Sequence, residues 1–271
     1  MNTPIPSRVL AVDVGNSRIK FGLFDLTSSG SALPELVESL AVAPDGPMPW
    51  AEIGAWLGES AAGGTRGIVA GSNPTARDAV VDGWPGDWLE PRVLADAGCL
   101  GLEARLAQPG RAGIDRLLNA VAVKWLVADD RPAIIVDSGT ATTVDVVDAD
   151  GVFLGGAILP GFGLLARSLH RYTALLPLIT LEELGTRPPE AVGEDTTAAI
   201  RSGLFFGQLG AVRELVQAMS DLLDGPPAEL FLTGGGGPLL ATALTEFRLV
   251  PHLGLCGLAA VARVDDPEPT T

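Results

Sequence analysis

The stretches VLAVDVGNSRIK (residues 9–20) and IIVDSGTATTVD (residues 134–145) resemble each other, although they lie in different halves of the chain. Each predicts an apolar strand, a turn that contains Asp-x-Gly, and a second strand. Glycine permits the tight reversal, and the turn leaves backbone N–H groups and small polar side chains for phosphate oxygens. A carboxylate beside such a turn can hold a cation that neutralises phosphates. Two ordinary hairpins would look similar, but the repetition favours two similar lobes that face one nucleotide.

Length and composition agree with a two-lobed protein. The 271 residues exceed a typical single domain, and 47% hydrophobic residues with a mean hydropathy of +0.32 supply apolar material for a core. The sequence holds no run of 18 uncharged apolar residues, so no membrane span is predicted. Residues 1–8 lack a secretion-signal pattern. The two cysteines, Cys99 and Cys256, provide neither a disulfide framework nor the spacing of a metal site. We therefore expect a reduced, cytoplasmic protein.

The formal net charge of −15, from 33 acidic and 18 basic residues, restricts the possible partners. No basic stripe is available to displace counterions, which argues against nucleic acid as a partner. An anionic ligand would need local donors or metal ions, because the overall field repels it. A simpler explanation of the net charge is that an acidic surface keeps the protein soluble.

Hydrophobic periodicity predicts a mixed sheet with helices in each lobe. In the first lobe we expect strands at 8–14, 19–25, 37–42 and 67–71 and helices at 51–57, 72–81 and 113–128, whereas residues 84–110 have no clear assignment. In the second lobe we expect strands at 133–136, 142–147, 152–158 and 229–233 and helices at 161–172, 196–223 and 238–245. The expected division is an N-terminal lobe over residues 1–130, a C-terminal lobe over 131–264 and a disordered polar tail over 265–271.

The chain lacks both the P-loop and the Gly-x-Gly-x-x-Gly dinucleotide motif. The order of its other motifs resembles that of the type III pantothenate kinases. These motifs are DVGNS (13–17), GIDR (113–116), DSGTATT (137–143), GGAILPG (155–161), TALLP (173–177), GEDT (193–196), SG (202–203) and TGG (233–235). Each motif alone is weak, but their common order over most of the chain is specific.

The resemblance implies an α/β fold of two ribonuclease H-like lobes, the acetate and sugar kinase/Hsp70/actin fold, with the nucleotide in the interlobe cleft. It implies an enzyme that transfers the γ-phosphate of ATP to pantothenate to form 4'-phosphopantothenate, the first step of coenzyme A biosynthesis. The implied cofactors are Mg²⁺ and a monovalent cation, K⁺ or NH₄⁺. The family also implies a homodimer.

The resemblance also assigns roles to residues. Asp115 would be the catalytic proton acceptor, and Asp137 would hold the monovalent cation. Asp13 would orient the Mg²⁺-bound phosphates. The further ATP-binding residues would be Val14, Gly15, Asn16, Ser17, Arg18, Ile19, Lys20, Thr140, Gly234 and Gly235, and pantothenate would contact Gly113, Ile114, Asp115, Arg116 and Thr196.

Local chemistry leaves alternatives open for several of these residues. Asp115 in the first turn of a helix also complements the helix dipole, and Thr196 would also make a good N-cap. Lys20 would also fit a solvated strand position. A plain strand-to-helix turn explains two of the four glycines at 234–237, whereas all four would let a flat ligand such as adenine approach the backbone.

One departure concerns acceptor recognition. Many family members carry a tyrosine shortly before Gly-x-Asp-Arg, whereas this chain has residues 106–109 (LAQP) there and Tyr172 as its single tyrosine. Acceptor affinity or selectivity is therefore expected to differ. Two other functions stay open: a kinase of the same fold for another small acceptor, and a nucleotide-binding regulatory protein like the Bvg accessory factors named in this family.

The long apolar helix at 196–223 bears on the oligomeric state. Its apolar residues exceed what one shallow lobe readily buries, and Gly203, Gly207 and Gly210 would permit close approach of a second helix. A helix buried inside its own lobe is the alternative.

Overall fold

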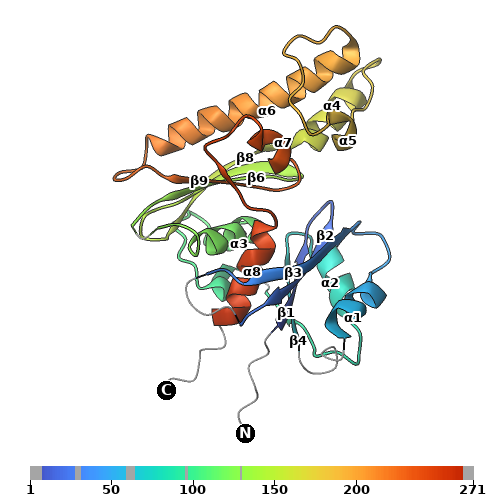
Figure 1. The fold of residues 1–271 in the computed structure, drawn as a ribbon, viewed down its shortest axis with the longest axis vertical. Coiled ribbons are helices and arrows are strands. Elements are labelled where there is room, and N and C mark those ends of the chain that lie inside the picture. Colours follow the sequence, from blue (N-terminus) through green and yellow to red (C-terminus); the bar gives the residue numbers. More distant parts are fainter. Residues whose placement is uncertain (1–7, 28–31, 59–64, 95–96, 129, 265–271) are drawn as a thin grey trace. The chain divides into compact units, whose positions relative to one another are not determined.

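The computed structural model describes residues 8–27, 32–58, 65–94, 97–128 and 130–264 (Figure 1). The chain divides into two compact units. Unit 1 comprises residues 1–103, 107–126 and 253–271, and unit 2 comprises residues 104–106 and 127–252. Within the described ranges, no helix is long and apolar enough to cross a membrane.

Unit 1 is built on a five-stranded mixed sheet with the order β3-β2-β1-β4-β5. The strands are β1 (Arg8–Val14), β2 (Ile19–Asp25), β3 (Glu35–Val42), β4 (Thr65–Gly71) and β5 (Arg92–Val93). β1, β2 and β3 form an antiparallel meander, and β4 and β5 extend it in parallel. β1 is buried along nearly its whole length, so its last residues reach the sheet edge in a fixed position.

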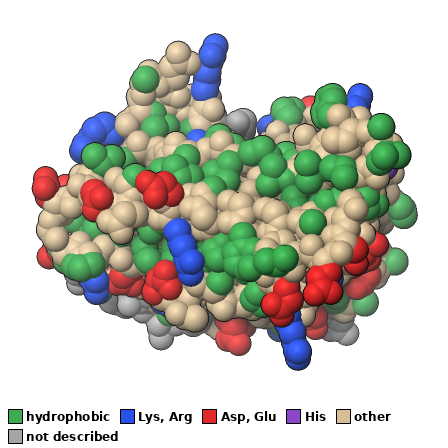
Figure 2. Space-filling view, turned by 90° about the horizontal axis from the view of Figure 1, so that it is seen from above, with side chains coloured by type: hydrophobic (Ala, Val, Ile, Leu, Met, Phe, Trp, Pro, Cys, Tyr) green, Lys and Arg blue, Asp and Glu red, His purple; other side chains and the backbone are tan. Residues whose placement is uncertain are grey.

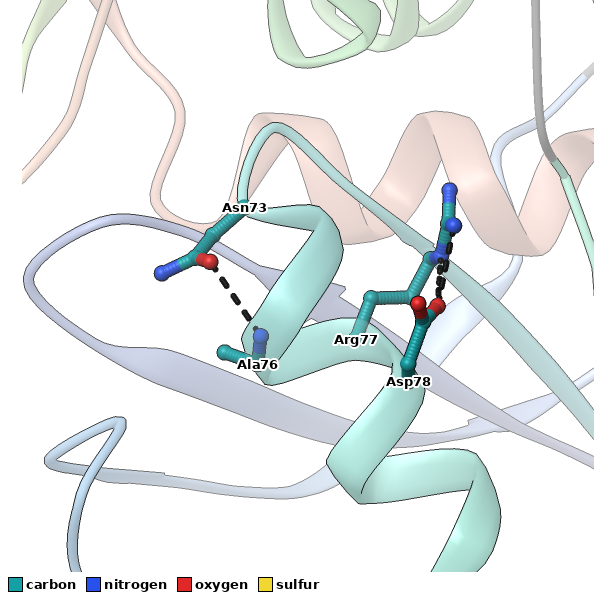
Figure 3. Close-up of polar contacts among 4 residues, drawn as sticks. All are labelled: Asn73, Ala76, Arg77 and Asp78. Carbon is teal, nitrogen blue, oxygen red and sulfur yellow. Dashed lines mark hydrogen bonds and ion pairs between the residues drawn. The ribbon is translucent and has the colours of Figure 1, made fainter.

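Two short helices of unit 1 connect the strands. α1 (Trp50–Leu57) precedes β4, and α2 (Pro74–Asp82) follows it. The side chain of Asn73 caps α2 by accepting a 3.2 Å hydrogen bond from the Ala76 N–H, while Arg77 and Asp78 pair on the same helix (Figure 3). Three tryptophans, at positions 50, 84 and 88, pack edge to face beside α1.

The other helices of unit 1 are α3 (Ile114–Val123) and α8 (Leu253–Val264), with short 3-10 turns at Ala97–Leu100 and Pro109–Arg111. α3 is shorter than predicted, because i to i+3 hydrogen bonds at Trp125 and Leu126 turn the chain after Val123. α8 packs against α3 and β1. The 3-10 turns and β5 occupy the region that the sequence left unassigned.

Unit 2 repeats the same plan. Its sheet has the order β10-β9-β6-β7-β8, formed by β6 (Ala133–Ser138), β7 (Ala141–Val147), β8 (Phe153–Pro160), β9 (Glu229–Thr233) and β10 (Arg248–Leu249). Its helices are α4 (Phe162–Tyr172), α5 (Leu181–Leu184), α6 (Thr196–Ser220) and α7 (Gly237–Ala241). With β6 matched to β1, both sheets have the same strand order, which confirms the prediction of two similar lobes.

The structure corrects the predicted division of the chain. Residues 253–264 were assigned to the C-terminal lobe, but they form α8, which belongs to unit 1 because Leu253, Leu255 and Leu258 are buried there. The boundary lies after Leu126 rather than after residue 130, and residues 104–106 join unit 2 through a bridge from Ala104 to Phe153. The predicted disordered tail at 265–271 lies outside the described residues.

Candidate functional site

The first predicted phosphate turn joins β1 to β2 in unit 1. The Gly15 N–H donates to the Arg18 carbonyl at 3.0 Å, which closes the turn. Asn16, Ser17 and Arg18 are exposed on it, whereas Val14 and Ile19 are fully buried in the core. Of the predicted contacts in this stretch, those of Val14 and Ile19 are therefore restricted to backbone atoms.

Asp13 and Lys20 are directly paired across the hairpin. Asp13 is only 6% exposed, and the Lys20 Nζ lies 3.2 Å from its Oδ2. The Lys20 side chain is 40% exposed, so its ammonium group reaches both Asp13 and solvent. The pair thus places a buried carboxylate beside a partly exposed ammonium group.

Asp115 lies in the first turn of α3, half-buried beside this pair. Burial raises the pKa of its carboxyl group above the ordinary value, and the like charge of Asp13 raises it further. The N–H of Arg116 donates to its Oδ1 at 3.0 Å, which opposes this shift. Asp115 therefore interacts with Asp13 of the first hairpin, and its environment makes it a stronger base than an exposed Asp.

Sequence reasoning missed Asn119, which follows Asp115 by one turn of α3. It is buried, and its Oδ1 lies 3.5 Å from where a Cβ of Gly254 would stand, while the same Cβ position lies 3.9 Å from the Oδ2 of Asp13. The N-terminal end of α8 thus lies beside both side chains. A polar residue within the apolar run LLNAVAV was the signal that could have identified it.

The second predicted turn joins β6 to β7 in unit 2. The Gly139 N–H donates to the Ala141 carbonyl at 3.0 Å, and Gly139 and Thr140 are exposed. Asp137 stands at the end of β6, paired in register with Thr143 on β7 and Thr233 on β9. These three side chains therefore share one face of the sheet, opposite the face that carries Val136 and Val144.

The glycine run at 234–237 packs against this second turn. Gly234 has a φ of 85°, and a Cβ there would overlap the Oδ1 of Asp137. A Cβ on Gly236 would overlap the Ser138 Oγ, and the Gly236 N–H donates to the Ser138 carbonyl at 2.8 Å. Gly235 is exposed, with no atom near its Cβ position. Close packing therefore explains Gly234 and Gly236, whereas the backbone at Gly235 is accessible to solvent.

The predicted acceptor residues are distributed over both units. Gly113, Ile114 and Arg116 surround Asp115 at the beginning of α3, with Ile114 buried and the other two partly exposed. Thr196 is the first residue of α6 in unit 2 and is exposed. The N-cap of α6 is Asp195, whose side chain accepts from the Ala198 N–H at 2.7 Å, so the capping alternative for Thr196 is wrong.

The structure also shows the segment that lacks the tyrosine found in many family members. Residues 106–109 lead into the 3-10 turn before α3, whereas Tyr172 ends α4 in unit 2. Tyr172 lines a surface pocket of about 690 Å³ together with Arg167 and Arg171. Within the described residues, no three His, Cys, Asp or Glu side chains are grouped to hold a metal ion.

Comparison with known proteins identifies the family. The family model of the type III pantothenate kinases matches residues 9–218. The type III pantothenate kinase of Gluconobacter oxydans is 35% identical over 264 residues, which cover 94% of this chain and 92% of that protein. The enzyme of the same name from Desulfosudis oleivorans is 32% identical over 268 residues, covering 93% and 98% of the two chains.

Solved structures agree on the fold. A protein from Campylobacter jejuni assigned to the Baf family of transcriptional activators has a TM-score of 0.58 and 17% identity, covering 94% of this chain and 98% of its own. The activator of 2-hydroxyisocaproyl-CoA dehydratase from Clostridium difficile, with bound ADPNP, has a TM-score of 0.55 and 12% identity, covering 95% of each chain. The fold is that of the acetate and sugar kinases, Hsp70 and actin, and the chain belongs to the type III pantothenate kinase family.

Proposed function

We propose that this protein transfers the γ-phosphate of ATP to the primary hydroxyl of pantothenate, giving 4'-phosphopantothenate and ADP. Family membership supports the reaction. The observation on which the proposal chiefly depends is the half-buried Asp115, which interacts with Asp13 and has a raised pKa. A paired carboxylate and ammonium beside a second, more basic carboxylate match the needs of phosphoryl transfer, which are charge neutralisation and a proton acceptor.

Asp115 acts as the general base. Its carboxylate accepts the proton of the acceptor hydroxyl as the oxygen–phosphorus bond forms and the bond to ADP breaks. The loose transition state of phosphoryl transfer requires only late proton removal, so a carboxylate with a raised pKa is a sufficient base. Gly113, Ile114 and Arg116 adjoin it on α3, and the Arg116 guanidinium provides a partner for the carboxylate of pantothenate.

Asp13 is the residue that would hold Mg²⁺ through the phosphates. The donor set fits, because a buried carboxylate beside an exposed turn suits an ion that keeps water and substrate phosphate among its ligands. Bound Mg²⁺ would neutralise the charge that develops on the transferred group. Lys20 and the exposed residues Asn16, Ser17 and Arg18 would contact phosphate oxygens.

The second turn would bind the remainder of ATP and a monovalent cation. Thr140 is exposed on the turn, and Gly235 presents open backbone for the adenine. Asp137 would hold K⁺ or NH₄⁺, since it is the last residue but one of β6 and its carboxylate lies against the backbone of Gly234. Thr196, which is not needed as a cap, is assigned to pantothenate. A reaction between ATP and a small vitamin is one that we expect of a cytoplasmic protein.

A homodimer is the final part of the proposal, although the surplus of apolar residues predicted for α6 does not support it. The apolar residues Ile200, Leu204, Phe205, Leu209 and Val212 of α6 are buried inside unit 2, so they require no partner. The outer face of α6 instead presents Phe206, 41% exposed, beside Gly203, Gly207 and Gly210. Hydrophobic side chains gather on the side of unit 2 that carries α6 (Figure 2). A second copy would cover this face.

Turnover of a panel of acceptors tests the proposal. Purified protein with ATP and Mg²⁺ should release ADP with pantothenate and produce 4'-phosphopantothenate detectable by mass spectrometry. Asp115→Asn provides the matched control, because the asparagine Oδ1 can still accept from the Arg116 N–H. ADP release that depends on another small alcohol, but not on pantothenate, would contradict the proposed acceptor.

A further inference from the structure

Gln208 is a buried amide in the middle of α6. It is 2% exposed and has apolar neighbours along the helix, including the buried Leu204, Phe205, Leu209 and Val212. Both ends of its amide are used. Its Oε1 accepts from the Thr142 hydroxyl at 2.8 Å, and its Nε2 donates to the Pro160 carbonyl at 2.7 Å. The bond to the Pro160 carbonyl fixes the orientation of the amide, because exchanging its oxygen and nitrogen would place two acceptor oxygens together, whereas the Thr142 hydroxyl can donate or accept.

These two partners lie next to the second phosphate turn, on the neighbouring strands β7 and β8. Thr142 is the second residue of β7, directly after the turn, and Pro160 is the last residue of β8, which pairs with Ala141. The next residue, Gly161, donates its N–H to the Thr140 carbonyl at 3.1 Å. A Cβ on Gly161 would overlap the Gly139 carbonyl oxygen, so the backbone at 160–161 lies directly against the turn.

A short chain of contacts therefore links α6 to the turn. It runs from the Gln208 amide to the Pro160 carbonyl, through one peptide bond to the Gly161 N–H, and on to the Thr140 carbonyl. The Thr142 hydroxyl, directly after the turn on β7, bonds to the same amide. A leucine at this position would bury apolar surface without the desolvation that an amide costs. The buried amide of Gln208 therefore fixes the position of the backbone beside the turn, whereas an apolar side chain would only pack against it.

We propose that Gln208 is a positioning residue for ATP, which holds the Ser138–Ala141 turn and the adjoining 160–161 backbone in the arrangement that receives the nucleotide. The inference deepens the proposed function and rests on it, because it takes the second turn as an ATP contact. Gln208 itself touches neither substrate. Its loss therefore acts on ATP affinity through the turn. Acceptor binding is unaffected, because the hydrogen bonds of Gln208 go to Thr142 and Pro160 and to neither Asp115 nor Thr196.

The test compares four variants by steady-state kinetics and thermal unfolding. Gln208→Leu removes both hydrogen bonds, and Thr142→Val removes one of them while keeping the shape of the side chain. Thr142→Ser keeps the hydroxyl. Ser202→Ala is the matched control, because Ser202 is also buried on α6 and donates to a carbonyl at 2.8 Å, but that carbonyl belongs to Ala191 and lies outside the turn.

We expect Gln208→Leu and Thr142→Val to raise the KM for ATP by about tenfold. This factor corresponds to the net free energy of roughly one buried hydrogen bond. The KM for pantothenate should stay near the wild-type value, and Thr142→Ser and Ser202→Ala should keep the wild-type KM for ATP. If Gln208→Leu does not fold, Thr142→Val decides the question. The inference is overturned if Gln208→Leu or Thr142→Val lowers the melting temperature as Ser202→Ala does but leaves the KM for ATP unchanged.

Failure of the proposed function is distinguished by a binding measurement. Calorimetric titration of each variant with a non-hydrolysable ATP analogue and Mg²⁺ reports nucleotide affinity without turnover. If the wild type binds the analogue but phosphorylates no pantothenate, the acceptor assignment fails, and the same tenfold loss of analogue affinity in Gln208→Leu still supports the positioning role. If the wild type does not bind the analogue, both the proposed function and this inference are overturned.

Discussion

Replacing Asp115 by asparagine separates catalysis from folding in this protein. Asparagine has nearly the same shape, and its Oδ1 can still accept the 3.0 Å hydrogen bond from the Arg116 N–H. It cannot accept the proton of the acceptor hydroxyl. Loss of a general base typically lowers the rate by a factor of about 10² to 10⁴. We expect kcat for Asp115→Asn to fall within that range.

The thermal stability of Asp115→Asn should be kept or raised, whereas an ordinary damaging mutation lowers it. The pKa of Asp115 is raised in the folded protein, so the stability that its protonated carboxyl group contributes is fully present below the unfolded pKa and is lost as the pH rises through the folded pKa. At neutral pH the ionised group is therefore unfavourable, because of burial and the charge of Asp13. Asp115→Asn should have a melting temperature equal to or above that of the wild type.

The assay is ADP release at saturating ATP and pantothenate, together with thermal unfolding of both proteins. The KM for ATP should change little, because Asp115 lies outside both phosphate turns. A folded Asp115→Asn variant that keeps kcat within about tenfold of the wild type would refute the role of Asp115 as general base.

Other outcomes follow from the same geometry. The kcat/KM of the wild type should fall as the pH drops through the raised pKa of Asp115, at a pH above its ordinary value of 3.8, and Asp13→Asn should lower that pKa in an NMR titration; an unchanged pKa would show that the two carboxylates do not interact. Lys20→Met should raise the KM for ATP by about tenfold while changing stability by less than ~1 kcal/mol, and an unchanged KM would limit Lys20 to its pair with Asp13. If Asp137 holds a monovalent cation, rates should be higher in K⁺ or NH₄⁺ than in Na⁺, whereas equal rates would remove that role. Sedimentation should show a dimer that Phe206→Glu dissociates, and a monomeric wild type with full activity would contradict the dimer proposal.

The sequence was most informative where strands are short and strongly apolar. β1, β2 and β9 begin and end at the predicted residues, and each has an Asp-x-Gly or glycine turn at one end of its apolar run. The repeated pattern also predicted correctly that β6 and β7 would reproduce the first hairpin. Local patterns succeed here because a buried strand and its turn depend mainly on their own residues.

The parts that depend on long-range packing were not predictable. α8 was missed, because Leu253–Val261 is apolar or small at every position, and its place in unit 1 depends on contacts with α3. The predicted surplus of apolar residues on α6 was wrong for the same reason, since the core of unit 2 accommodates them. Asn119 and Gln208 are polar residues within apolar helices, and only their partners in space show what they hold.

The most direct test of the account is single-turnover transfer from γ-labelled ATP with the purified wild-type protein. Protein in excess over ATP, with Mg²⁺, K⁺ and pantothenate, should move the label to 4'-phosphopantothenate, and Asp115→Asn should bind ATP but transfer the label more slowly by a factor of about 10² to 10⁴. Label that stays on ATP in the wild type, while an ATP analogue binds normally, would contradict the central claim and favour a nucleotide-binding protein without this activity.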